Sequence, residues 1–209
     1  LNMCGFLYTG ADLCGFGADT TEDLALRWMQ FGVFTPLMRN HAALGTREQE
    51  LYQFSNSEAC GRMVKIRYSL LPYLYSEYMK AALRDEMMFR PLAFDYPDDP
   101  YADQIEDQLM IGDSMMSAPV YEQNKTGRYV YLPEDMMLVS MRSPEDYTVQ
   151  VVEQGHHYVP VAMDELIFFI KKDHVIPMAE SAKSVSDMDF EHLNLLGYVT
   201  DKAVYELYD

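Results

Sequence analysis

Cysteine is scarce in this chain of 209 residues, and its cysteines show no pairing pattern. Cys4, Cys14 and Cys60 make an odd number and contain no CxxC pair. Such a set argues against both a disulfide framework and a zinc site. The sequence therefore predicts a reducing compartment, and we expect a cytoplasmic protein.

Positive charge and long apolar runs are also lacking. Lys and Arg number 16 against 33 Asp and Glu residues, which gives a formal net charge of −17. Nucleic acids and anionic membrane surfaces need clustered basic side chains, so we expect neither as a partner. No apolar run approaches the roughly 18 to 20 residues of a membrane helix. The first six residues also lack the basic start of a signal peptide.

Hydrophobic residues make up 49% of the chain and aromatic residues 13%, enough to bury the core of one or two domains. In the first part, β-prone runs at 6–9 and 37–38 are each followed by a polar loop. A helix is expected from Thr20, as its N-cap, to about Phe34. A long, core-facing helix is expected over about 57–83.

Two strand–loop–helix units imply a pair of parallel strands. Parallel sheets are stable almost only when several strands are covered by helices on both faces, so two units cannot close a domain. The usual architecture that repeats this unit is the (β/α)8 barrel, whose ligand groups follow the carboxyl ends of its strands. Asp12 and His41 stand in such loops. We therefore predict that residues 1–86 are part of a (β/α)8 barrel.

After Arg84 the sequence pattern changes from helical periodicity to short β-rich runs separated by turn residues. The runs are 91–96, 115–121, 129–132, 148–152, 158–161 and 166–170. This spacing is typical of an antiparallel β-sandwich, which we predict over residues 87–209.

Several motifs, in the same order along the chain, resemble those of glycoside hydrolase family 31. Thr9–Phe16 resembles the loop after the family's seventh barrel strand, and Met38–His41 resembles the end of the eighth. Further similar stretches are Arg27–Gln30, Phe34–Pro36, Arg67–Tyr75, Arg90–Leu92, Asp107–Asp113, Ala118–Val120 and Tyr129–Pro133. The resemblance implies an α/β plus all-β fold, in which the last two β/α units of a TIM (β/α)8 barrel precede an antiparallel β-sandwich.

The same resemblance implies a retaining α-glucosidase that removes terminal α-linked glucose from oligosaccharides without a metal or organic cofactor. The family's nucleophile is an aspartate on an earlier barrel strand. Its acid/base is an aspartate in a tryptophan-rich motif that ends in Gly-Asp-Asn. Neither motif occurs in this chain. We therefore expect the 209 residues alone to be inactive and to supply only substrate-binding residues.

Four residues are the candidates for that binding role. The resemblance implies that His41 binds hydroxyls of the glucose in the −1 subsite, against the alternative of a core or loop histidine satisfied by backbone. Asp12 either contacts the sugar or orients a neighbouring arginine, or else it turns its own loop. Phe16 stacks on a sugar or packs in the core. Arg39 lies near the pocket floor or pairs with a carboxylate for structural reasons.

Other chemistry is less well supported by the sequence. Cys14 is interpreted as a small buried thiol. His156-His157 follows Gly155 with no third ligand at metal-binding spacing, so a hairpin turn is expected there and no metal site.

Other functions stay open at this point. A non-catalytic carbohydrate-binding or structural module is one, and an α-xylosidase or transglucosylase of the same family is another. An incomplete barrel also leaves strand edges and apolar helix faces uncovered, which favours a homo-oligomer.

Overall fold

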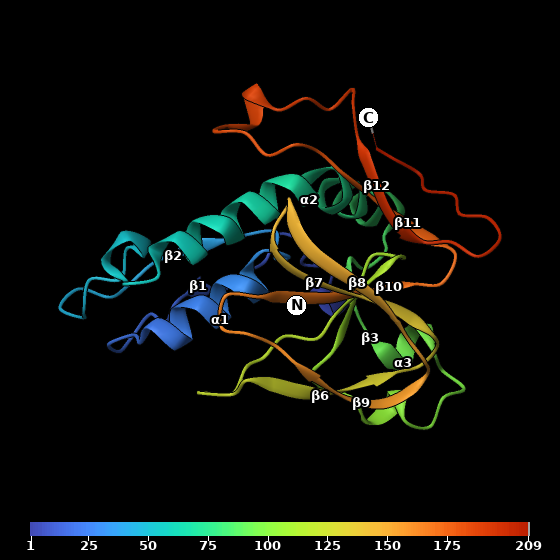
Figure 1. Ribbon diagram of the computed structural model, residues 1–209, viewed down its shortest axis with the longest axis horizontal. Helices are drawn as coiled ribbons and strands as arrows, with labels where there is room; N and C mark the ends of the chain where they lie inside the picture. The colour runs from blue at the N-terminus through green and yellow to red at the C-terminus, as the bar shows by residue number, and fades with distance from the viewer. Residues whose placement is uncertain (209) are drawn as a thin grey trace.

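A computed structural model describes residues 1–208 as helices packed on a central antiparallel sheet (Figure 1). The helices are α1 (Glu22–Gly32), α2 (Ser57–Arg84) and α3 (Leu92–Asp95). The strands are β1 (Asp12–Leu13), β2 (Arg39–Asn40), β3 (Phe89–Pro91), β4 (Leu109–Ile111), β5 (Met115–Ser117), β6 (Gly127–Leu132), β7 (Met136–Ser143), β8 (Asp146–Val152), β9 (Gly155–Pro160), β10 (Leu166–Lys171), β11 (His174–Met178) and β12 (Asn194–Tyr198). Within this described part, no helix is long and apolar enough to cross a membrane.

The first part contains the expected parallel strand pair, but the strands lie a few residues later than predicted. β1 pairs with β2 in parallel, with Asp12 opposite Arg39. Residues 6–9 and 37–38 are not strands, although the Leu37 amide already donates to the Thr9 carbonyl at 3.2 Å. The Leu37 carbonyl oxygen lies 2.0 Å from where a Cβ on Gly10 would stand. The two segments therefore approach closely before the β1–β2 ladder begins, and Gly10 permits that approach because it has no side chain.

The two main helices form where the pattern predicts them. α2 agrees with the predicted range to within one residue. α1 is capped one residue later than predicted, because the side chain of Thr21 accepts from the Leu24 amide at 3.2 Å. The Thr20 hydroxyl instead donates to the Thr21 carbonyl.

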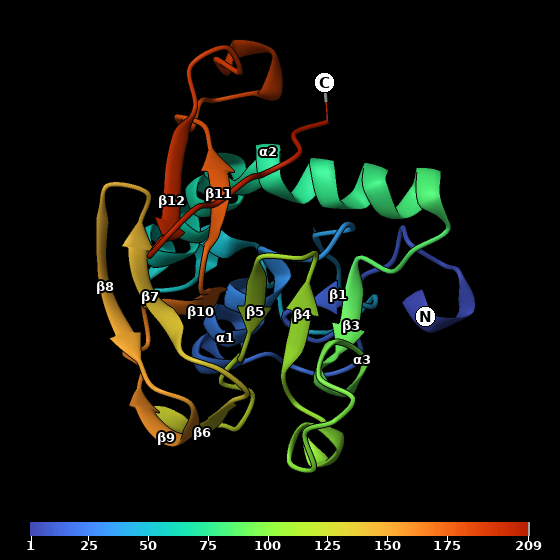
Figure 2. The same cartoon turned by 90° about the vertical axis from the view of Figure 1, so that its right-hand side faces the viewer.

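The central sheet has the strand order β3-β4-β5-β10-β7-β8, and all its pairings are antiparallel (Figure 2). Successive side chains of a strand point to opposite faces of the sheet, so β10 contributes to two hydrophobic cores. Phe168 and Ile170 pack in a core with α1 and α2, whereas Ile167 and Phe169 pack in a second core with β6 and β9. At β10 the sheet is therefore buried on both faces, between the helices and the β6–β9 ribbon.

The second part is antiparallel as predicted, but the two layers of its sandwich differ in size. The second β layer is the two-stranded β6–β9 ribbon, and β11 and β12 form a separate pair against α2. The predicted strand at 91–96 is wrong, because Pro91 ends β3 and the helical turn α3 follows from Leu92. The strands β4, β7, β11 and β12 were not predicted, and the methionine-rich run of β7 carries few β-branched residues.

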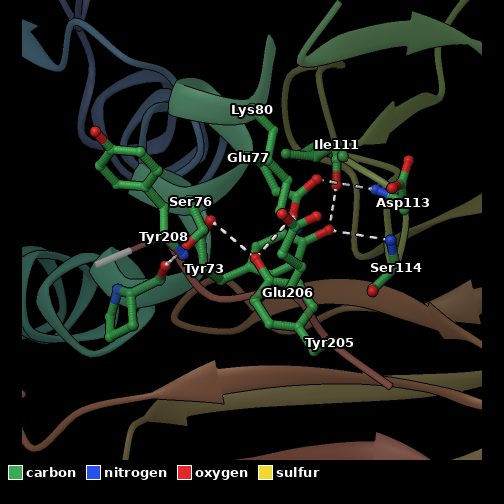
Figure 3. Close-up of polar contacts among 12 residues, drawn as sticks. Tyr73, Ser76, Glu77, Lys80, Ile111, Asp113, Ser114, Tyr205, Glu206 and Tyr208 are labelled. Carbon is green, nitrogen blue, oxygen red and sulfur yellow. Dashed lines mark hydrogen bonds and ion pairs between the residues drawn. The ribbon is translucent and has the colours of Figure 1, made fainter. Parts of the chain in front are cut away.

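The C-terminal segment returns to α2 and closes over a buried polar cluster (Figure 3). The Glu77 carboxylate pairs with Lys80 at 2.8 Å and accepts from the Tyr205 hydroxyl at 2.7 Å. The Lys80 ammonium also lies 4.1 Å from the Tyr205 ring centroid. The other Glu77 oxygen accepts from the Asp113 amide at 3.2 Å. These partners compensate a buried charge pair that would otherwise be costly.

Candidate functional site

The edge formed by the ends of β1 and β2 brings the four predicted site residues into two pairs. The first pair is Asp12 and Arg39, which are register partners of the parallel ladder. Asp12 Oδ1 accepts from Arg39 Nε at 2.9 Å and also from Nη2. Both side chains remain partly open to solvent. The guanidinium is therefore held by Asp12 while part of it stays accessible.

The second pair is Phe16 and His41, which follow the two strands. Their ring centroids are 5.5 Å apart and their planes are inclined by 32°. Both side chains are exposed, so neither is a core residue. The Ala43 amide donates to the Phe16 carbonyl at 2.9 Å and ties the two loops together. An aromatic face and an imidazole thus share one surface beside the Asp12–Arg39 pair.

The turn after β1 explains how Phe16 reaches this surface. Cys14 and Gly15 both have left-handed backbones, with φ of 70° and 90°. Two such residues in succession reverse the chain sharply after the strand, a conformation rare outside glycine. The Cys14 side chain is fully buried, and this burial, with a smaller effect of Cys60, raises its pKa to about 12. The interpretation of Cys14 as a small buried thiol is confirmed.

Gln49 is a site residue that the sequence did not suggest. Its side chain is buried, and Nε2 lies within hydrogen-bonding distance of three acceptors: Leu13 O at 3.2 Å, Asn40 Oδ1 at 2.7 Å and His41 O at 3.1 Å. Asn40 Nδ2 returns a hydrogen bond to the Gln49 carbonyl at 2.8 Å. Gln49 therefore links the ends of both strands to the backbone of His41. It stands in an ordinary polar run, so no sequence signal marked it.

Arg47 fixes the outer side of the same two loops. Its amide donates to Asp19 Oδ1 at 2.6 Å, and its guanidinium donates to the Thr20 carbonyl at 3.0 Å. The segment that follows β2 is thereby fastened to the segment that precedes α1. Loops held by such cross-links are better suited to presenting a fixed binding surface than free loops are.

The chemistry of this edge is that of recognition. The imidazole of His41 can both donate and accept, the Arg39 guanidinium donates, and Phe16 offers an aromatic face. The Asp12 carboxylate is engaged by Arg39, and the Asp19 carboxylate by the Arg47 amide. Such groups can hold a neutral polyhydroxyl ligand. In the described residues 1–208, no three His, Cys, Asp or Glu side chains converge as a metal site would require.

Two family models match the chain. The glycosyl hydrolases family 31 TIM-barrel domain matches residues 1–77, and the glycosyl hydrolase family 31 C-terminal domain matches residues 85–176. Lysosomal α-glucosidase of Bos taurus is 33% identical over 93% of this chain and 22% of its own length. Alpha-glucosidase 2 of Bacillus thermoamyloliquefaciens is 32% identical over the whole chain and 26% of its own length. The chain thus spans about a quarter of these relatives.

Solved structures show the same fold. The cycloalternan-forming enzyme of Listeria monocytogenes, in complex with a pentasaccharide substrate, superposes on the whole chain with a TM-score of 0.85 at 24% identity, over 21% of its own length. A dextranase of Flavobacterium johnsoniae, in complex with isomaltotriose, covers 89% of the chain with a TM-score of 0.77 at 25% identity, over 23% of its own length.

Proposed function

The chain belongs to glycoside hydrolase family 31, and we propose that the protein that carries it is a retaining α-glucosidase acting on terminal α-linked glucose. In this proposal the chain supplies the last two β/α units of the barrel, the sugar-binding residues on them and the β-domain behind them. One observation carries it: the parallel pair β1–β2 delivers Asp12, Arg39, Phe16 and His41 to one edge. That edge is the position of ligand groups in a (β/α)8 barrel.

Each side chain has a role suited to its surroundings. His41 donates to one sugar hydroxyl and accepts from another, because neutral imidazole has one nitrogen of each kind. Arg39, held by Asp12, donates to a further hydroxyl in a fixed direction. Phe16 offers its exposed face to the sugar ring beyond the cleaved bond.

The covalent chemistry is assigned to residues outside these 209. Retaining hydrolysis needs two carboxyl groups about 5 to 5.5 Å apart, one as nucleophile and one as acid/base. Within this edge, the Asp12 carboxylate is already engaged by the Arg39 guanidinium. We therefore propose that this edge positions the glucose and that the carboxyl pair lies elsewhere in the protein.

Hydrolysis of p-nitrophenyl α-glucoside tests the proposal. The enzyme that carries this chain should hydrolyse it, whereas the 209-residue chain alone should not. His41→Ala should lower kcat/KM by about 100-fold, in the range for a lost group that binds the transition state. His192→Ala, at an exposed histidine bonded to Asp189, is the matched control. Unchanged kinetics of the His41 variant would remove this residue from the site.

Parallel assays identify other activities. Preference for p-nitrophenyl α-xyloside would indicate an α-xylosidase, and transfer of glucose to an acceptor sugar would indicate a transglucosylase. Sugar binding without turnover in the longest natural form of the protein would indicate a non-catalytic module. Any of these three results would contradict the α-glucosidase assignment.

Two further expectations remain proposals. The three cysteines are free thiols in the structure, which supports a reducing, cytoplasmic setting. The short β1–β2 pair has unpaired edges, which supports self-association of the isolated chain. Cell fractionation tests the first, and light scattering of the isolated chain tests the second.

A further inference from the structure

The outer face of the β6–β9 ribbon carries a strip of aromatic side chains. Tyr129 lies opposite Tyr158 in the ladder, and Tyr131 lies opposite His156. Residues two apart on a strand share a face, so all four project from the same side. The opposite side of the ribbon is buried against the central sheet through Val130 and Val159. Tyr129, Tyr158 and His156 therefore lie on the exposed face, whereas Tyr131 is only 4% exposed and belongs to the second core.

Much of this strip is open to solvent. Tyr129 is 74% exposed and Tyr158 is 52% exposed, with ring centroids 5.2 Å apart. Further along, Tyr101 is also exposed and lies 5.4 Å from His156, and the two cover the ring of Tyr131. Single exposed aromatic residues are ordinary, but contiguous ones mark a surface that binds something.

A groove with fixed polar groups lies at each end of the strip. Near Tyr129, a hollow of about 230 Å³ contains Asp107, whose carboxylate is held by Arg128 at 2.7 Å and by the Tyr121 hydroxyl at 3.0 Å. The Arg128 guanidinium in turn lies over the Tyr121 ring.

Beside Tyr131, a second hollow of about 560 Å³ contains Asp99. The Asp99 carboxylate accepts from the Tyr131 hydroxyl at 2.5 Å and from the Tyr101 amide at 2.9 Å. Two strand positions separate Tyr129 from Tyr131, or about 7 Å, so the strip and both hollows exceed the length of one hexose.

The chemistry of the strip selects a neutral polyhydroxyl polymer. Carboxylates at both ends, on a chain of net charge −17, repel nucleic acids and other anionic polymers. An apolar partner would remove these polar groups from water without offering them further hydrogen bonds, which is costly. A sugar chain presents C–H faces to aromatic rings and hydroxyl groups to carboxylates, so it satisfies both kinds of group.

The turn before the ribbon adjoins the start of α1, which follows the loop that carries Phe16. The Asn124 amide, in the turn before β6, donates to Asp23 at the start of α1 at 3.3 Å. A smaller hollow between them is lined by Asp19 on one side and by Tyr121 and Glu122 on the other. The start of α1 and the turn before β6 lie on the same side of the molecule (Figure 1). A barrel helix starts at the face where ligands bind, so the turn that leads into β6 borders that face.

We propose that the outer face of the β6–β9 ribbon is a second binding site, for an α-linked glucan chain. The choice of an α-glucan rests on the proposed function, whereas the neutral polymer rests on the strip itself. The site would hold a polysaccharide alongside the surface of Phe16 and His41 and so favour long substrates over short ones.

Affinity electrophoresis tests the site, with the protein that carries this chain run through gels containing soluble starch or dextran. Retardation by at least one glucan is expected. The double variant Tyr129→Ala/Tyr158→Ala should weaken it by about tenfold or more, because each aromatic contact contributes up to about one factor of ten. Tyr147→Ala, at an exposed tyrosine of β8, should leave it unchanged. The variant Tyr129→Phe keeps the stacking face and should be retarded like the parent.

Kinetics separate this proposal from the α-glucosidase assignment. The double variant should hydrolyse p-nitrophenyl α-glucoside normally, while its KM for starch or dextran rises and kcat stays unchanged. No retardation of the parent protein by either glucan, or equal retardation of parent and double variant, would overturn the second site. Retardation that depends on the tyrosines, in a protein without α-glucosidase activity, would uphold the site and reject the assignment.

Discussion

Asp12 and Arg39 are at once register partners in the β1–β2 ladder and a hydrogen-bonded ion pair. The backbone ladder thus places a carboxylate directly beside a guanidinium, and the carboxylate fixes two of the guanidinium nitrogens. The remaining donors of Arg39 are free to face a ligand. The strand pairing itself therefore orients the Arg39 guanidinium.

Replacing Asp12 with Asn should impair substrate binding more than stability. Exposed ion pairs contribute only about 0 to 1 kcal/mol to folding, so Tm should change little. The loss of the charged acceptor releases Arg39, and KM for p-nitrophenyl α-glucoside should rise by about fivefold to tenfold. Glu58→Gln, which breaks an exposed pair with Arg62, is the control. A large fall in Tm with an unchanged KM would show that the Asp12 pair is structural.

Gln49→Ala should affect both stability and binding. The substitution leaves the buried Leu13 carbonyl without its donor and removes the hydrogen bond to Asn40, which costs about 1 to 3 kcal/mol of unfolding free energy. It also frees the backbone of His41, so kcat/KM should fall. Urea unfolding and steady-state kinetics measure the two effects. Gln53→Ala, at an exposed glutamine, should change neither, and equal behaviour of the two variants would contradict the linking role.

Stability should fall at alkaline pH through Tyr205. Burial, together with the charge of Glu77, raises the pKa of this phenol above its ordinary value near 10. The unfolded chain releases the phenolic proton above about pH 10, while the folded chain retains it. The contribution of Tyr205 to the free energy of unfolding is therefore complete below about pH 10 and is lost as pH rises. The slope reaches about 1.4 kcal/mol per pH unit for one group.

Tyr205→Phe removes the titrating hydroxyl and should flatten this part of the pH profile. At neutral pH the variant loses the hydrogen bond to Glu77, at a cost of about 1.5 to 3 kcal/mol for a bond to a charged group. Chemical unfolding at pH 8 and at pH 11 measures both effects. Tyr52→Phe, at an exposed tyrosine, is the control, and identical profiles for Tyr205→Phe and the parent would refute the linkage.

Thiol labelling should distinguish the three cysteines. Cys4 is exposed, whereas Cys14 and Cys60 are buried with raised pKa values. With a pKa of about 12, Cys14 is about one part in ten thousand thiolate at pH 8. A disulfide reagent should therefore label one thiol per native chain and three in denaturant. Rapid native labelling of Cys14, detected by peptide mapping, would contradict its buried position.

The order of elements could be predicted more securely than their ends. α2 followed from the spacing of its apolar side chains, which is a local property of the chain. The strand β7 did not, because Met136 and Met137 become strand residues through pairing with β8 and β10. Pro91 was expected to open a strand, but it ends β3 and caps the helical turn α3, and its fixed φ is compatible with that position.

The sequence by itself determined the succession of strand, loop and helix and the residue types that follow each strand, because periodicity and caps act over a few residues. Only the tertiary structure decided which of those residues meet. The partner of Asp12, the buried linking role of Gln49 and the docking of Tyr205 on α2 all depend on contacts between distant segments. The aromatic strip, too, exists only because β6 and β9 pair in one register, since a shift of one residue would turn Tyr158 toward the core.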